Sequence, residues 1–249
     1  MKIHTKRYVG LSSLLLATAL LIPSWVRASD CEPSLPNVRI EGGSTFERTS
    51  ACEGLKRATK FFQYFGFESK TDLEPIVYQF QEVVRTPCQE EQGTQCTPIR
   101  VAGMYNGETK TITMTSISQA WMKLPKRTYF KMRYNNELYV SVLAHEAAHA
   151  LSKQFYQKPP TTHAQDEYIA YASQLWSMES STRDKIFSLY PEDKYVFAHE
   201  LNINDIVHFS EPHAFGVMSY RHFSSPVGGK TMLTRIYNGD YQAPTMDMP

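Results

Sequence analysis

The stretch His145-Glu146-Ala147-Ala148-His149 decides both the fold and the chemistry that this sequence predicts. It lies in a segment whose apolar spacing predicts a helix over residues 137–155. Residues four apart share one face of a helix, so both imidazoles can bind one metal ion. Glu146 projects about 100° away from His145, where it can hold a water molecule without taking a ligand position. The alternative interpretation is a helix with two incidental histidines.

A third metal ligand is expected on the next helix, because catalytic zinc usually has three protein ligands and one water. Glu167 is the first candidate, and it lies 18 residues after His149. The Pro159-Pro160 turn would fold the second helix, predicted over about 162–178, back against the first. Asp166 is the close alternative and His163 a weaker one. An acidic residue early in a helix also suits the helix dipole without any metal.

The HEAAH motif followed by a glutamate on the next helix resembles the gluzincin class of zinc metallopeptidases. The resemblance covers roughly residues 98–180 and implies a zincin-like core that binds one Zn²⁺ ion. It implies that His145, His149 and Glu167 hold the zinc. It also implies that Glu146 is the general base for a zinc-bound water. More specifically, the chain resembles a family of small exported bacterial zincin-like proteins of unknown function.

The oxyanion formed in such a reaction needs a hydrogen-bond donor besides the metal. A tyrosine or histidine from the C-terminal helical segments is expected in this catalytic role, with Tyr220 as the first candidate and His222 as the second. The alternative interpretation is that Tyr220 packs in the core. The other C-terminal histidines, His199, His208 and His213, are interpreted as structural or exposed.

The remaining pattern predicts an α+β fold. We expect a small, mostly antiparallel sheet with an edge hairpin, packed on the motif helix and the ligand helix and followed by C-terminal helices. Asn106-Gly107 predicts the hairpin over residues 99–115, whose edge could pair with an extended peptide. Further elements are predicted as a strand over 76–84 and helices over 50–65, 182–189, 200–208, 213–222 and 229–238.

The first 28 residues have the pattern of a secretory signal peptide. Lys2, Lys6 and Arg7 precede an apolar run, and cleavage is expected after Ala28. The run has about 12 residues, whereas a spanning helix needs roughly 20, so we expect no stable membrane insertion after cleavage. The sequence therefore predicts an exported protein, periplasmic or secreted.

Residues 29–249 are expected to form one zincin-like domain. Its three parts are a disulfide-bearing segment (29–97), a catalytic core (98–180) and a helical segment (181–249). Four cysteines in an exported protein suggest disulfides, and we favour Cys31–Cys52 and Cys88–Cys96. A structural zinc site is the alternative, although no CxxC spacing supports it.

Composition and charge exclude several classes of protein. The chain is 42% hydrophobic and 20% charged, which is typical of a globular protein and not of a disordered one. Its formal net charge is +1, and loss of the first 28 residues, with four basic and no acidic side chains, makes it −3. Neither value supports binding to nucleic acid.

These observations together predict an exported zinc-dependent metallopeptidase that acts on a peptide or protein substrate. Two alternatives stay open. One is a non-catalytic zincin-like protein that binds metal and interacts with a partner. The other is a zinc amidase that acts on cell-wall peptides.

Overall fold

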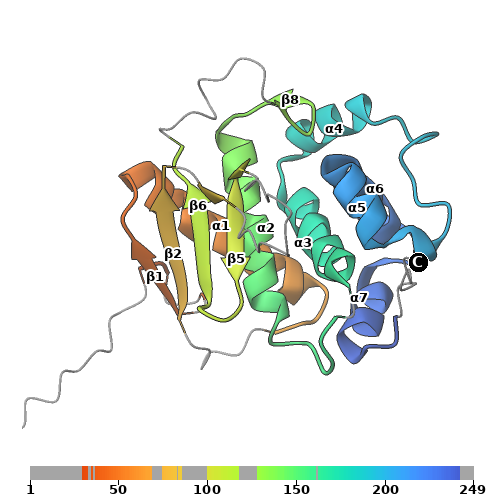
Figure 1. Ribbon diagram of the computed structural model, residues 1–249, viewed down its shortest axis with the longest axis horizontal. Helices are drawn as coiled ribbons and strands as arrows, with labels where there is room; N and C mark the ends of the chain where they lie inside the picture. Colours follow the sequence, from red (N-terminus) through yellow and green to blue (C-terminus); the bar gives the residue numbers. More distant parts are fainter. Residues whose placement is uncertain are drawn as a thin grey trace, which may run out of the picture.

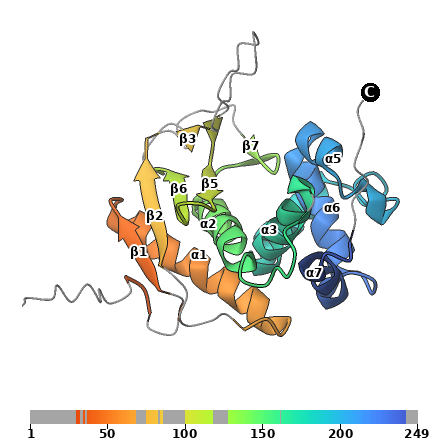
Figure 2. The same ribbon diagram turned by 60° about the horizontal axis from the view of Figure 1, so that its bottom comes forward.

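Helix α2 (Asn136–Ser152) carries the HEAAH motif and lies between a β-sheet and helix α3 (His163–Ser177), as Figures 1 and 2 show. The computed structural model describes residues 30–32, 35, 37–68, 75–82, 84–85, 100–117, 128–160 and 162–241. Its other helices are α1 (Thr45–Tyr64), α4 (Ser180–Leu189), the 3₁₀ helix η1 (Glu200–Asn202), α5 (Asp205–Ser210), α6 (Pro212–Ser224) and α7 (Gly229–Asn238). Its strands are β1 (Val38–Glu41), β2 (Ile76–Gln81), β3 (Val84–Arg85), β4 (Arg100–Val101), β5 (Gly103–Asn106), β6 (Thr111–Thr115), β7 (Thr128–Tyr129) and β8 (Met132–Arg133).

The fold is α+β, as predicted, but its main sheet is mixed. The strand order is β1-β2-β6-β5, with β1–β2 and β2–β6 parallel and β5–β6 antiparallel. The expectation of a mostly antiparallel sheet is therefore wrong for this sheet. The reason is the connection between β1 and β2, which runs through α1, and strands joined through a crossover helix pair in parallel.

The predicted hairpin is confirmed as β5 and β6. The side chain of Asn106 accepts hydrogen bonds from the N–H groups of Glu108 and Thr109, at 2.9 and 3.1 Å, which closes the turn. The first strand is shorter than predicted, because β4 pairs with β3 in a separate two-stranded sheet. Strand β5 thus forms the edge of the main sheet that lies against α2.

Helix α1 begins at Thr45, five residues before the predicted start. Ser44 is its N-cap, and the N–H of Ser44 donates to the carboxylate of Glu47 at 2.6 Å, as in a capping box. The same buried carboxylate accepts hydrogen bonds from the hydroxyl of Ser116 and, at 2.8 Å, from the N–H of Ile117. Glu47 therefore joins the start of α1 to the end of β6.

The helices predicted after the HEAAH motif are confirmed. Helices α3, α4, α6 and α7 lie where the sequence placed them, and the segment over 200–208 divides into η1 and α5. Gly239 ends α7 with φ at 73°, a left-handed conformation that glycine adopts without strain. In Figures 1 and 2 the helices α5, α6 and α7 lie on the side of α3 that faces away from the sheet.

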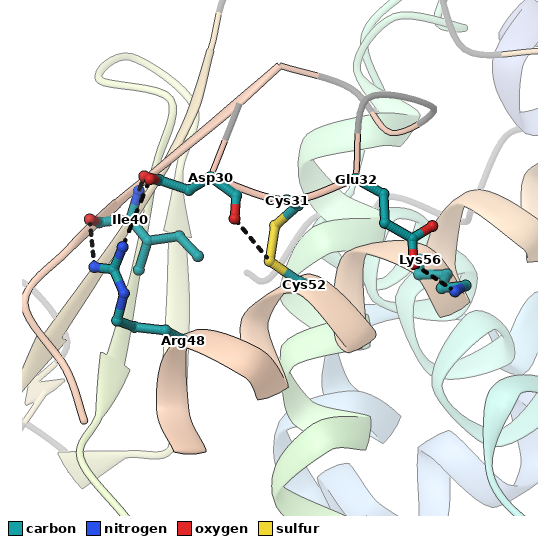
Figure 3. The surroundings of a disulfide bond; sticks show 7 residues. All are labelled: Asp30, Cys31, Glu32, Ile40, Arg48, Cys52 and Lys56. Atoms are coloured by element: carbon teal, nitrogen blue, oxygen red, sulfur yellow. Dashed lines mark hydrogen bonds and ion pairs between the residues drawn. A yellow bond between two sulfur atoms is a disulfide. The ribbon is translucent and has the colours of Figure 1, made fainter. Parts of the chain in front are cut away.

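One predicted disulfide is confirmed. Cys31 is bonded to Cys52, which ties the segment before β1 to helix α1 (Figure 3). Ion pairs on either side, Asp30 with Arg48 at 3.5 Å and Glu32 with Lys56 at 3.0 Å, hold the same segment. A cross-link over 21 residues stabilises a fold by about 3 kcal/mol through the entropy of the unfolded chain.

Two further expectations fall outside the described residues, namely the signal peptide over residues 1–28 and the pair Cys88–Cys96. Within the described ranges, none of the helices is long and apolar enough to cross a membrane. A single hydrophobic core runs from Val38 in β1 to Tyr241 after α7.

Replacing Gly54 with alanine is expected to destabilise the protein by about 1–3 kcal/mol. A Cβ on Gly54 would lie 2.6 Å from Leu143 Cβ and 2.9 Å from the Leu143 carbonyl carbon, so α1 would have to move away from α2. Alanine is favoured over glycine in helices by about 1 kcal/mol, which offsets only part of this clash. Thermal unfolding followed by circular dichroism measures the change.

The matched control is Gly107→Ala, since a Cβ on Gly107 would make only ordinary contacts at 3.8 and 3.9 Å. This variant should unfold close to the wild type. A Gly54→Ala protein as stable as the wild type would show that the close approach of α1 and α2 does not depend on glycine.

Replacing Glu47 with glutamine is expected to lower the free energy of unfolding at pH 7 by on the order of 2 kcal/mol. Burial alone would raise the pKa of Glu47, but hydrogen bonds from Ser116, Ser44 and Ile117 outweigh it and hold the pKa below 4.5. A carboxyl whose pKa is lowered on folding stabilises the protein above pH 4.5, and this stabilisation is lost as the pH falls below that value.

Urea unfolding at pH 7 and at about pH 3 tests this linkage. The difference between the wild type and Glu47→Gln should be smaller at the lower pH. An equal difference at both values would mean that the charge of Glu47 does not stabilise the fold. Glu108→Gln, on an exposed turn, is the control and should have little effect at either pH.

Candidate metal centre

Helix α2 directs His145 and His149 to one point beside α3. The side chain of Asn135 caps the helix by accepting a hydrogen bond from the N–H of Leu138 at 2.9 Å. Both histidines are buried, and their Nε2 atoms lie 3.2 Å apart. The spacing of four residues therefore brings the two imidazoles together, as the sequence predicts.

Helix α3 brings Glu167 to the same point. Its Oε2 lies 3.4 Å from Nε2 of His145, and its Oε1 lies 3.4 Å from Nε2 of His149. All three residues are buried, and their ligand atoms lie within 4.8 Å of one another. These three residues, which we call the triad, can therefore hold a metal ion.

The charges within the triad favour a cation. Burial would raise the pKa of Glu167, but His149 and His145 outweigh it and hold the pKa well below 4.5, so the group is a carboxylate at neutral pH. Burial would lower the pKa of His149, but Asp166 and Glu167 hold it well above 6.5. The negative charge of Glu167 and Asp166 therefore attracts a cation to these imidazoles, which is a proton on His149 when no metal ion is bound.

Asp166 lies behind His149 and not among the atoms of the triad. Its Oδ2 is 3.4 Å from Nδ1 of His149, on the far side of the ring from Nε2. The same carboxylate accepts hydrogen bonds from the hydroxyl of Tyr156 at 2.7 Å and from Nζ of Lys153 at 3.1 Å. Asp166 therefore contacts the back of the His149 ring, whereas Glu167 offers its carboxylate to the point where the triad could hold a metal ion.

Glu146 lies beside the triad and against strand β5. The N–H of Tyr105 donates a hydrogen bond to its carboxylate. A Cβ on Gly103 would lie 2.9 Å from Cγ of Glu146, so only glycine leaves room for this side chain. Burial raises the pKa of Glu146, and the nearby charge of Glu167 adds to this effect, although His145 and His149 oppose it.

Two aromatic side chains border the triad. The ring of Tyr171 packs edge-on against the ring of His145, with centroids 4.6 Å apart. A Cβ on Gly216 would lie 2.5 Å from that tyrosine ring, so α6 can approach α3 closely only with glycine there. Burial raises the pKa of the Tyr129 hydroxyl, and the charges of Glu146 and Glu167 contribute, which places Tyr129 near both carboxylates.

The two donors predicted from the C-terminal segment lie elsewhere. Tyr220 packs on Phe187 and under the guanidinium of Arg183. The Nδ1 atom of His222 lies 2.9 Å from the hydroxyl of Tyr168, and its Nε2 faces Glu200 at 3.7 Å. The structure brings neither residue into the triad, because both project from parts of α6 that pack on other elements.

Two other histidines lie next to Glu167. His163, the weaker ligand candidate, has its Nε2 3.2 Å from Oε1 of Glu167. His208 is buried, with its Nε2 3.5 Å from Oε2 of Glu167, and burial lowers its pKa to about 4. The interpretation of His208 as merely structural or exposed missed this contact, which depends on how α5 folds back over α3.

The other two histidines of that group fit the interpretation. His199 is exposed, and His213 packs edge-on against Tyr129 with ring centroids 4.5 Å apart. Burial and the charge of His145 lower the pKa of His213 to about 4, but its ring atoms are not among the clustered ligand atoms of the triad.

Comparison with known proteins identifies a family. The sequence model of a family of unknown function, DUF6639, matches residues 38–245. The chain belongs to this family. The matched range includes every helix and strand from β1 to α7, and therefore both helices, α2 and α3, that carry the triad. Neither the curated proteins nor the solved structures contain a match to the chain.

Asp166→Asn is expected to weaken metal binding by about 10- to 100-fold, because a neutral amide orients the imidazole of His149 less firmly than a carboxylate does. Glu167→Gln is expected to abolish binding at the triad, since it removes a ligand charge. Competition with a chromophoric chelator measures both affinities in this DUF6639 protein.

Asp193→Asn, on an exposed loop, is the control and should bind metal like the wild type. The opposite ranking, with binding abolished in Asp166→Asn and kept in Glu167→Gln, would identify Asp166 as the ligand.

Proposed function

We propose that this protein is an exported, gluzincin-like zinc metallopeptidase that hydrolyses peptide bonds. The proposal rests on the convergence of two imidazoles and one carboxylate beside a buried acid, Glu146, that takes no ligand position. A tetrahedral zinc ion with bonds of about 2.0–2.1 Å holds neighbouring ligand atoms about 3.3–3.4 Å apart. The distances of 3.2 to 3.4 Å within the triad are close to that value.

His145, His149 and Glu167 would hold the ion, and Asp166 would keep His149 oriented. When bound, zinc supplies a Lewis acid that polarises the substrate carbonyl and makes water nucleophilic near neutral pH. The buried Nδ1 of His145 has no hydrogen-bond partner among the described residues, so the ring is held by its contacts with Tyr171, His149 and Glu167.

Glu146 would move the proton. Its carboxylate would accept a proton from the attacking water and later deliver it to the nitrogen of the leaving group. Burial raises the pKa of this carboxyl, which makes it a stronger base and keeps it able to act as an acid afterwards. The hydrogen bond from the N–H of Tyr105 fixes the carboxylate at the sheet edge.

Strand β5 would bind the substrate as an added strand. It is the outermost strand of the main sheet as described, and its partner β6 lies on the other side. An extended peptide that bonds to the outer edge would run past Glu146, because the N–H of Tyr105 on that edge already faces the carboxylate. This position would bring the scissile bond to the triad.

Tyr171 is the better candidate for a donor to the oxyanion than Tyr220 or His222. It packs on His145, and burial raises the pKa of its hydroxyl, with the nearby charges of Glu167 and Glu146 adding to the effect. A neutral phenol is a hydrogen-bond donor, which is the form this role requires.

The disulfide supports the exported location in this proposal. The bond between Cys31 and Cys52 is typical of exported proteins, and the predicted signal peptide would direct the chain there. We therefore place the proposed activity in the periplasm or outside the cell.

Glu146→Gln is expected to keep the bound zinc and to cleave peptides at least about 100-fold more slowly than the wild type, because a neutral amide cannot accept a proton. Cleavage of a peptide library derived from a whole proteome, read by mass spectrometry, measures the loss and identifies the bonds cut. Zinc content by elemental analysis shows whether the site is intact.

The matched control is Glu192→Gln, which makes the same chemical change at an exposed position. Equal cleavage by the wild type and Glu146→Gln would exclude catalysis by this site. Zinc binding without any cleavage by the wild type would favour the non-catalytic binding protein. Cleavage confined to cell-wall peptides would favour the amidase.

A further inference from the structure

The carboxylate of Glu167 faces more imidazoles than one metal centre needs. Two of them are His145 and His149 of the triad. The other two are His163, with its Nε2 3.2 Å from Oε1, and His208, with its Nε2 3.5 Å from Oε2. All four rings therefore direct a nitrogen atom at one carboxylate.

The second pair is held in place by its own contacts. His163 is the first residue of α3, one helical turn before Glu167, so both side chains share a face. The carboxylate of Asp205 accepts a hydrogen bond from the N–H of Ala164 at 2.6 Å, which ties α5 to the start of α3. The ring of Phe209 stacks on His163 at 5.6 Å, with an angle of 13° between the planes.

We propose that His163, Glu167 and His208 form a second site for a divalent transition-metal ion, with Glu167 shared between the two sites. The ligand atoms of these three residues lie within 4.8 Å of one another, as those of the triad do. Two imidazoles and a carboxylate suit Zn²⁺ or Co²⁺ better than Mg²⁺ or Ca²⁺, which prefer oxygen ligands.

A bridging role explains why each carboxylate oxygen has two imidazole neighbours, one from the triad and one from the second pair. An ionised carboxylate has about four positions at which it can accept hydrogen bonds or bind cations, so it can serve two ions at once. One ion that took all four imidazoles and Glu167 would have five protein ligands and no open position for water or substrate. Two ions with three protein ligands each keep such positions.

The two sites differ in their access to solvent. The side chains of His145, His149 and Glu167 are 8%, 9% and 11% exposed, whereas that of His163 is 51% exposed. An ion at the second site would therefore exchange more easily than one at the triad. The site shares Glu167 with the proposed zinc site but requires no peptidase activity.

Metal stoichiometry tests the inference. The purified protein is stripped with a chelator, dialysed against Co²⁺ or Zn²⁺ and analysed for metal and protein content. We expect two ions per chain for the wild type and one for His163→Ala or His208→Ala. His145→Ala/His149→Ala should also keep one ion, at the second site. His199→Ala, which removes an exposed imidazole outside both clusters, should bind two.

The outcomes separate this inference from the proposed function. One ion per wild-type chain that only the His145 and His149 substitutions remove would overturn the second site and leave the zinc site intact. If the wild type binds one ion, and substitution of any of the four histidines weakens that binding, the protein has a single metal centre. This result would also overturn the second site. No bound ion in a wild-type protein shown to be folded by circular dichroism would contradict both proposals. Because His163 is largely exposed, His163→Ala should fold even where His208→Ala does not.

Discussion

A buried carboxylate among imidazoles is the constraint on which the rest of this structure depends. As a whole residue Glu167 is 8% exposed. Burying a charge at such a depth without a compensating charge would lower the free energy of unfolding by several kcal/mol. Its partners come from three helices, namely His145 and His149 from α2, His163 from α3 itself and His208 from α5. The helices α2, α3 and α5 therefore meet around one charge as well as through apolar packing. A cation within the cluster would supply compensation that the imidazoles give only when protonated.

The helix that carries the motif can be buried because its neighbours come unusually close. Gly54 of α1 leaves no room for a side chain against Leu143 of α2, and in the next layer Gly216 of α6 likewise meets the ring of Tyr171 on α3. Ala147 and Ala148 are fully buried within the motif itself. With α2 covered by the sheet, α1 and α3, its polar side chains depend on groups from other elements, and Asp166 and the N–H of Tyr105 provide them.

The predictions that were confirmed rest on short sequence patterns. The helical spacing of His145 and His149 needs no tertiary information, and a proline turn before the next helix is enough to bring back Glu167. The parallel pairing of β1 with β2 and the contact of His208 depend on long-range packing that no short pattern encodes. The choice of Tyr220 failed for the same reason: a residue type and a helix can be predicted, but not the face of that helix that meets α3. The capping box of Ser44 and Glu47 was a readable signal that would have placed the start of α1 correctly.

Glu146 is the residue that a purely structural metal site does not require. A structural site is complete with its ligands, and a further buried acid beside it only adds a desolvation cost. Here the acid is 6% exposed, lies against the sheet edge through the N–H of Tyr105 and has a raised pKa. Gly103 leaves room for the Glu146 side chain, since a Cβ there would collide with both Met114 and Glu146. Buried acids with a shifted pKa that are held by specific contacts are concentrated at functional sites. The cost of keeping Glu146 in this position is the physical argument that favours the proposed catalysis over a non-catalytic metal-binding protein.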